Sequence, residues 1–175
     1  IQSGERSSRI HVRKVDKSKF DEEAGIILNI LNDAWSDNWG YVPLTDREIA
    51  YAGKKLKPIV KEDLIRIAEV EGRPVAFMMT LPDLNEPLKG MNGSLWPFNW
   101  AKLLLWLRNP RVRTMRVPLM GVRSEYQFSR LGPTLALVLI ESIQASLIRH
   151  GIEAVEMSWI LEDNAGMRNI LEHIG

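Results

Sequence analysis

The sequence predicts a mixed α/β (α+β) domain, in which flanking helices cover a mixed, mostly antiparallel central sheet. Apolar runs of strand length recur along the chain, and segments with helical apolar spacing separate them. The last segments run strand, helix, strand, helix, which requires a crossover and one parallel strand pair. The chain has 175 residues, 45% of them apolar, which is enough for the core of one domain.

The first third of the chain predicts a flexible tail, one strand and two helices. Acidic residues open the first helix, where they suit the positive end of the helix dipole. Thr45 and Glu48 form a capping-box pattern, and Pro58 ends the helix that they begin. The expected segments are the tail 1–8, a single domain over 9–175, a strand at 9–15, and helices at 21–33 and 45–57.

The middle of the chain predicts a hairpin followed by an insertion. The apolar runs 64–70 and 74–81 flank Glu71-Gly72-Arg73, a short turn of the kind that joins antiparallel strands. Residues 86–110 are broken by glycine and proline and contain a short apolar helix near 100–107. This helical insertion either packs on the sheet or forms a lid or a wall of an acceptor pocket.

The last segments predict a strand at 111–122, a helix at 134–149, a strand at 154–161 and a helix at 164–174. Pro118 lies inside the first of these strands and cannot donate a ladder hydrogen bond, so we expect this strand to bulge or to part from a neighbour. Gly132-Pro133 opens the long helix, with proline at its first position, and Gly151 ends it.

Composition excludes several classes of function. The 23 basic and 22 acidic residues leave a net charge of +1, which argues against a nucleic-acid partner. The absence of cysteine excludes disulfides and thiolate sites, and the three histidines lack metal-ligand spacing, so we expect no metal. No apolar run reaches the roughly 18 residues that span a bilayer. We therefore expect a cytoplasmic protein without a membrane partner.

The segment 118–133 predicts an anion site. It runs from strand through turn to helix, and the first turn of a helix presents unpaired N–H groups and a partial positive charge. Such amides can hold a phosphate or pyrophosphate, and Arg123 and Arg130 add full positive charges. Each arginine is equally well read as an ordinary surface charge. A strand that parts at Pro118 would leave a gap for a long ligand.

This segment resembles the acetyl-CoA signature of the GNAT N-acetyltransferase superfamily, Gln/Arg-x-x-Gly-x-Gly/Ala after an apolar strand. Gln127 matches its first position, Gly132 its last, and Arg130 replaces its middle glycine. The segment 159–175 resembles the second hallmark of that family, in which a strand is followed by Asn164, a helix and a final glycine.

The resemblance implies direct transfer of an acetyl or other acyl group from acyl-CoA to the amine of a small-molecule or peptide acceptor. Strand amides would hold pantetheine and polarise the thioester, and Asn164 would bind pantetheine or an ordered water. Glu156, or Glu125 in the turn, would act as general base, although each is also read as a solvated carboxylate. The implied catalytic residues are Glu156 and Asn164, and the implied cofactor-binding residues are Met120, Gly121, Val122, Gln127, Phe128, Ser129, Arg130, Leu131, Gly132, Pro133 and Asn164.

Two departures from the family pattern keep other functions open. Arg130 puts a side chain where the family uses close backbone approach. The family also adds two C-terminal strands, often with a catalytic Tyr, and these strands are expected to be missing after Gly175. One alternative is therefore a non-catalytic GNAT-fold module that binds acyl-CoA or a partner, and another is a site for a different ligand. An open sheet edge also makes a homodimer an expected arrangement.

Overall fold

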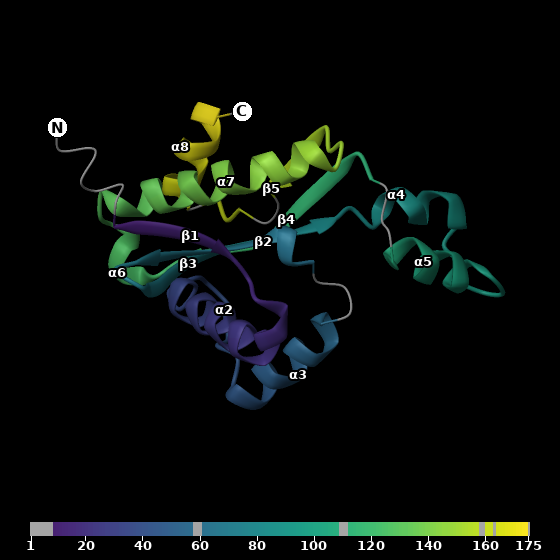
Figure 1. The fold of residues 1–175 in the computed structure, drawn as a ribbon, viewed down its shortest axis with the longest axis horizontal. Helices are drawn as coiled ribbons and strands as arrows, with labels where there is room; N and C mark the ends of the chain where they lie inside the picture. The colour runs from purple at the N-terminus through teal and green to yellow at the C-terminus, as the bar shows by residue number, and fades with distance from the viewer. Residues whose placement is uncertain (1–8, 58–60, 109–111, 158–159, 163, 175) are drawn as a thin grey trace.

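The computed structural model describes residues 9–57, 61–108, 112–157, 160–162 and 164–174, which form helices around one central sheet (Figure 1). The expected tail 1–8, Arg111, Trp159 and Gly175 lie outside the described residues. The strands are β1 Ile10–Lys14, β2 Ile65–Val70, β3 Arg73–Pro82, β4 Thr114–Val122 and β5 Ala154–Met157. The helices are η1 Lys17–Lys19, α2 Phe20–Ala34, α3 Asp46–Leu56, η2 Glu62–Leu64, α4 Asn85–Leu88, η3 Lys89–Met91, α5 Asn99–Arg108, α6 Ser124–Gln127, α7 Leu131–Arg149 and α8 Ala165–Ile174.

The sheet has the order β1-β2-β3-β4-β5, and the predicted mixed topology is confirmed. The first three neighbouring pairs are antiparallel, and β4 pairs with β5 in parallel. The β2–β3 hairpin turns at Glu71 (φ 54°) and Gly72 (φ 79°). Two successive residues at positive φ give the two-residue hairpin turn whose twist matches the strands.

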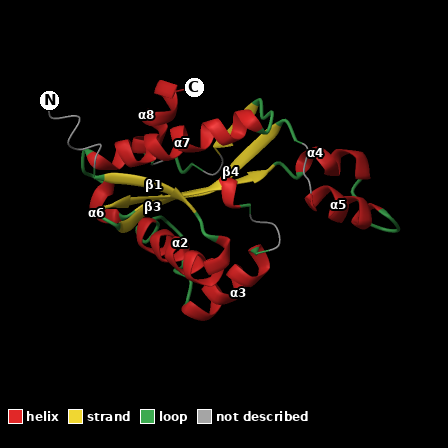
Figure 2. Cartoon of the chain, in the orientation of Figure 1, coloured by secondary structure: helices red, strands yellow, loops and turns green. Residues whose placement is uncertain are grey.

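Helices cover both faces of the sheet (Figure 2). On one face, Leu135, Leu139 and Ile143 of α7 are buried against strand residues such as Met78 and Met115. Their spacing of four residues puts them on one side of the helix, so α7 lies along the sheet. On the other face, α2 packs its apolar side on β2 and β3, with α3 beyond it; the buried residues there include Ile27, Ile30, Leu31, Ile67 and Phe77.

Buried polar side chains tie the helices to the strands. Arg66 on β2 is 4% exposed; its Nη2 donates to Ser146 Oγ of α7 at 2.9 Å, and its Nη1 donates to the carbonyl oxygens of Asp63 and Ile65. Burial lowers the pKa of Arg66, but the hydrogen bonds supply acceptors for the guanidinium. On the other face, Arg13 bridges Glu69 of β2 at 2.6 Å and Glu23 of α2 at 2.7 Å.

The long helix α7 is apolar enough and long enough to cross a membrane by these two criteria, and it is the one such helix in the described part of the chain. Its inner side nevertheless forms half of the core, and a buried core helix meets the same criteria. The helix begins at Leu131, so Pro133 occupies its third position rather than the predicted first. Proline is still tolerated there, because the N–H groups of the first turn lack helical partners.

The insertion between β3 and β4 projects from one end of the sheet, at the right in Figure 1. No residue of α5 is fully buried, but Trp106 packs against the core cluster on the α7 side of the sheet, so the insertion touches the core through this end of α5 and projects with the rest. The base of the insertion is fixed by Glu86, whose Oε1 accepts hydrogen bonds from the backbone N–H groups of Arg113 and Thr114 at 3.1 and 2.8 Å.

Candidate active site

A β-bulge interrupts β4 at the position where the sequence predicted one. Arg116 pairs with Leu81, and Leu119 pairs with Met79, so three steps on β4 match two on β3. The extra residue lies in the Val117–Pro118 pair, opposite Thr80. A bulge re-aims the side chains that follow it. Accordingly, Val117 and Met120, three residues apart, both pack on the α7 side of the sheet.

Immediately after this bulge the described pairing of β4 with β5 stops. The parallel ladder runs from the Thr114–Ala154 pair to the Val117–Met157 pair, and Pro118, the next residue on β4, has no N–H to extend it. Ser158 and Trp159 of the expected longer strand lie outside the described residues. The end of β4 therefore continues past the last described pair of the β4–β5 ladder.

Two backbone amides at this end of β4 point away from β3. The N–H of Arg123 donates to the carbonyl oxygen of Val75 at 2.9 Å. In an antiparallel pair, every second residue directs its N–H and C=O groups to the same neighbouring strand, so this bond shows which β4 residues face β3. Leu119 and Gly121 therefore bond to β3, whereas Met120 and Val122 present their N–H and C=O groups to the β5 side. Within the described ranges, neither the β3 ladder nor the β5 ladder accepts from the Met120 and Val122 N–H groups, which are parallel donors.

The carbonyl groups of the same two residues are already bound by side chains. Trp35 Nε1, just after α2, donates to Met120 O at 3.2 Å, and Gln127 Nε2 donates to both Val122 O and Ala34 O at 2.8 Å. Gly121 permits this approach, because a Cβ there would lie 3.1 Å from the Ala34 Cβ atom and 3.0 Å from the Phe77 ring. Each of these two carbonyl oxygens thus already accepts a side-chain hydrogen bond, whereas the N–H groups of the same residues have no partner among the described residues.

The turn from β4 to α7 is compact and bonded internally. The N–H of Ser129 donates to Tyr126 O at 3.0 Å, that of Leu131 to Ser129 Oγ at 3.1 Å, and that of Gly132 to Ser129 O at 3.3 Å. Pro133 has no N–H. A pyrophosphate would therefore have to displace Ser129 to use these amides. The Arg130 side chain is exposed and makes no ion pair with another described residue.

Gly132 has a steric reason to be glycine. A Cβ at this position would lie 2.6 Å from Tyr126 O, closer than real Cβ atoms come to such an atom, and would also make a tight contact of 3.1 Å with Gln127 O. The last glycine of the signature therefore lets α6 fold back onto the start of α7. Phe128, between these two helices, is 96% exposed.

The remaining polar residues proposed from the sequence are Glu156, Asn164 and Glu125, and each of them already has a partner within the protein. Glu156 of β5 is ion-paired with Arg116 Nη2 at 2.7 Å, and Arg116 Nε lies 3.5 Å from Asp83. Asn164 Oδ1 accepts from Met167 N–H at 3.0 Å, so Asn164 caps α8 and keeps only its amide NH₂ for a ligand. Glu125 pairs with Arg73 at 2.9 Å on the surface.

Several site features escaped sequence analysis. Arg123 donates to Pro74 O at 3.1 Å and to Asn29 at 2.9 Å, which turns it away from the phosphate role considered for it. Asp33 Oδ2 accepts from Ser124 N–H at 2.8 Å and so holds the turn to α2. Trp35 and Asp33 lie more than eighty residues from their partners. No local pattern in the sequence connects them to β4.

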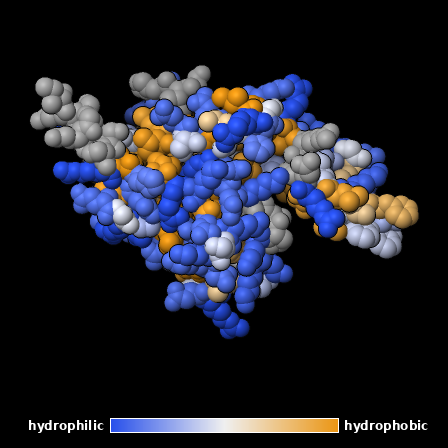
Figure 3. Space-filling view, in the orientation of Figure 1, coloured by the Kyte–Doolittle hydropathy of each residue, from blue (hydrophilic) through white to orange (hydrophobic). Residues whose placement is uncertain are grey.

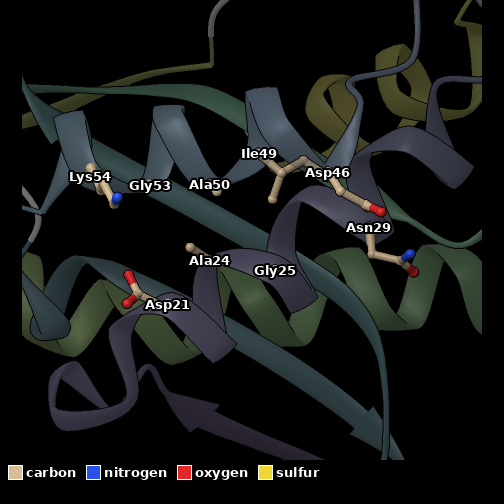
Figure 4. A pocket seen from close by; sticks show the side chains of 9 residues that line it. All are labelled: Asp21, Ala24, Gly25, Asn29, Asp46, Ile49, Ala50, Gly53 and Lys54. Carbon is tan, nitrogen blue, oxygen red and sulfur yellow. The ribbon is translucent and has the colours of Figure 1, made fainter.

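A groove between α2 and α3 lies elsewhere on the molecule (Figure 4). Its volume is about 310 Å³, and Ala24, Gly25, Ala50 and Gly53 leave the space between the two helices. Asp21, Asn29, Asp46 and Lys54 lie around it, with Ile49 on the α3 side. Asn29 connects the groove to the end of β4 through its hydrogen bond with Arg123, but no residue that lines the groove is described as bonded to the Met120 or Val122 amide.

Comparison with solved structures decides the fold. An aminoglycoside N-acetyltransferase in complex with CoA matches with a TM-score of 0.56 and 13% identity, over 95% of this chain and 86% of that one. The ribosomal-protein-alanine N-acetyltransferase of Brucella melitensis also gives 0.56 and 13%, over 95% and 90%. The chain has the GNAT acetyltransferase fold.

Two curated relatives extend the match to sequence. Protein YghO of Escherichia coli (strain K12) is 52% identical over 167 residues, which are 95% of this chain and 43% of that protein. The bacterial ceramide synthase of Caulobacter vibrioides is 37% identical over 168 residues, which are 96% of this chain and 44% of that protein. The chain thus spans less than half the length of these relatives. No family model matches it.

Proposed function

We propose that this GNAT fold binds an acyl-CoA and transfers its acyl group to an amine. The observation that carries the proposal is the pair of outward N–H groups of Met120 and Val122, beside the end of the described β4–β5 ladder. Two donors spaced along one strand suit the amide groups of pantetheine and the carbonyl oxygen of a thioester. The carbonyl oxygens of the same two residues accept hydrogen bonds from Trp35 and Gln127. They therefore do not compete with the ligand's acceptor groups for donors at this edge of β4.

The transfer requires few groups from the protein. The amine nitrogen forms a bond to the thioester carbonyl carbon, the C–S bond breaks, and the nitrogen loses a proton to a base. The leaving thiolate takes up a proton to give CoA. We propose Glu156 as that base. Because Glu156 is ion-paired with Arg116, a cationic amine that enters there competes with Arg116 for the carboxylate.

For the acceptor, we propose a long-chain amino alcohol of the sphingoid type. The support is the 37% identity to the bacterial ceramide synthase over 96% of this chain. The acyl donor would accordingly be a long-chain acyl-CoA rather than acetyl-CoA alone.

Binding and turnover need separate tests. In an amide-resolved NMR titration with CoA, the Met120 and Val122 signals are expected to shift more than those of Leu119 and Gly121, whose N–H groups bond to β3. These neighbours are matched controls on the same strand. Equal shifts along the strand, or no shift at saturating CoA, would remove the binding proposal.

Turnover is tested with the full-length natural protein, sphinganine and a long-chain acyl-CoA, with release of free CoA thiol as readout. Glu156→Gln is expected to lower kcat while the Kd for CoA stays unchanged. Activity on short polyamines but not on sphinganine would overturn the proposed sphingoid acceptor, while it would support acyl transfer to an amine.

A non-catalytic acyl-CoA-binding module is the second candidate. The observation that favours it is the internal hydrogen bonding of the Ser129, Leu131 and Gly132 amides, which leaves Arg130 as the exposed cation of the turn. Tight CoA binding without thiol release on any amine of a broad panel would select this function.

A further inference from the structure

An exposed apolar surface on the insertion is not used by the proposed reaction. We name it the aromatic patch, and its members are Leu95, Trp96, Phe98, Trp100, Leu104 and Leu105. Trp96 is 77% exposed, Phe98 73% and Leu105 67%. Large side chains rarely gather on a surface in this way without a partner, because their contact with water is unfavourable. The patch therefore indicates an interaction surface.

The patch lies on the part of the molecule that projects farthest from the sheet. Figure 3 shows hydrophobic residues at the far right, where Figure 1 places α5. The connection is firm, since Glu86 binds the backbone of β4 and the N–H of Asp83 donates to Thr114 O at 3.1 Å. The patch can therefore reach a flat surface while the sheet stays in water.

The apex of the insertion is also bonded within itself. Trp100 Nε1 donates to Pro97 O at 2.8 Å, and Asn99 Nδ2 donates to Ser94 O at 2.7 Å. The polar edge of this indole is thus satisfied inside the loop. An apolar environment around the patch would not leave that donor unpaired.

The charges around the patch have one sign. From Leu88 to Arg108 the sequence contains Lys89, Lys102 and Arg108 and no acidic residue, although the whole chain is nearly balanced. Lys89, Lys102 and Arg108 are all exposed. Tryptophan beside basic residues is the composition of segments that bind at the headgroup level of a bilayer. The positive charge favours anionic lipids in particular.

We propose that the α4–α5 insertion docks the protein on the surface of an anionic lipid bilayer, with the aromatic patch at headgroup depth. This departs from the expectation, drawn from sequence alone, that no membrane takes part. The proposal does not depend on acyl transfer, since the exposure, shape and charge of the insertion carry it.

The test is co-sedimentation of the full-length natural protein with two kinds of vesicle, phosphatidylcholine alone and phosphatidylcholine with phosphatidylglycerol. We expect binding to the mixed vesicles that weakens as salt is raised. Lys102→Ala is expected to weaken that binding about fivefold, from roughly 1 kcal/mol for each basic residue at the surface.

The apolar contribution is tested by the double substitution Trp96→Ser and Phe98→Ser, which should weaken binding about tenfold or more. Trp39→Ser is the matched control, because Trp39 is 96% exposed but lies outside the insertion. Both variants change only exposed side chains, and their unfolding temperatures should equal that of the natural protein.

Three results would overturn the proposal. The natural chain could stay in the supernatant with both vesicle types, as it would if the rest of a longer chain covered the patch. The double variant and the Trp39 variant could bind equally well. Sedimentation velocity could show a dimer that the double variant breaks without any vesicle binding, which would assign the patch to a second copy of the chain.

Discussion

Trp35 and Met120 are joined by a hydrogen bond of 3.2 Å from the indole Nε1 to the backbone carbonyl oxygen. The bond connects the end of α2 to the part of β4 that lies beyond the β5 ladder. It occupies the acceptor of a residue whose N–H has no partner among the described residues, so it orients a donor without blocking it. This hydrogen bond makes the position of the Met120 N–H on β4 depend on how α2 packs against the sheet.

Replacing Trp35 tests that link. Trp35→Phe removes the donor and keeps most of the apolar surface, so we expect CoA affinity to fall about fivefold, from roughly 1 kcal/mol for one hydrogen bond. Titration calorimetry with CoA measures the change. Trp39→Phe, at an exposed position, is the control; a similar loss in both variants would count against a role for the Met120 bond.

The glycine of the β4–α7 turn should not tolerate a side chain. Gly132→Ala brings a Cβ against Tyr126 O, and we expect a loss of stability of about 1–3 kcal/mol from the forced shift of the turn. Urea unfolding measures it. Gly25→Ala, in α2 with nothing within 4 Å, should instead gain up to about 1 kcal/mol. A neutral Gly132→Ala would mean that the turn is looser than described.

Arg130 is expected to replace the missing backbone cradle as the phosphate ligand. Because the neighbouring amides donate within the turn, Arg130→Gly should weaken CoA binding about tenfold, in the range of one charge-assisted hydrogen bond. Arg130→Lys should restore part of it. The affinity for dephospho-CoA, compared across the same variants, reports which phosphate is contacted. Tighter binding by Arg130→Gly would instead support the glycine signature.

The buried arginine of β2 is expected to stabilise the packing of α7. Arg66→Ala removes the side-chain donor to two carbonyl oxygens and one of the two donors to Ser146 Oγ, which keeps Arg149, and we expect a loss of roughly 2–4 kcal/mol. Arg66→Met, which refills the space, should lose less. Chemical denaturation at neutral pH compares the two. Equal losses of stability in the two variants would contradict this expectation, because the volume that methionine refills would then make no difference.

Acid should weaken the junction between β1 and η2. The hydrogen bond from Lys14 lowers the pKa of Asp63, so this contribution is present above the ordinary pKa of aspartate. This contribution is lost as the pH falls through the lowered pKa of Asp63, because the carboxylate is then protonated in the folded protein as well as in the unfolded one. Asp63→Asn should therefore reduce the melting temperature at neutral pH, and the difference from the natural protein should shrink in acid. An undiminished difference would contradict the linkage.

Local rules predicted much of this fold, because features such as caps, turns and bulges depend on residues that are neighbours in the sequence. The capping box of Thr45 and Glu48 forms as predicted, and the turn at Gly72 joins the expected strands. Pro118 marked the bulge because an imino nitrogen cannot donate, whatever its tertiary surroundings. Helix starts were less accurate, as Pro133 shows, because several positions of a first turn accept proline.

The site was harder to predict, because long-range contacts decide which groups remain free. Gln127 matches a family position, yet its side chain points back to Val122 and Ala34. Glu156 could be placed on a strand, but its pairing with Arg116 depends on the register between β4 and β5. The projection of the insertion also depends on tertiary structure, because an apolar helix has the same pattern whether it is covered or exposed.

The sequence by itself determined the five strands, the helices α2, α3, α5, α7 and α8, and the break at Pro118, since these follow from backbone chemistry and apolar spacing over a few residues. Only the tertiary structure decided which amides of β4 face away from the ladder, which cations are already bound and which apolar side chains are left in water. These outcomes depend on the packing of segments far apart in the chain, and no local pattern encodes the distances between them.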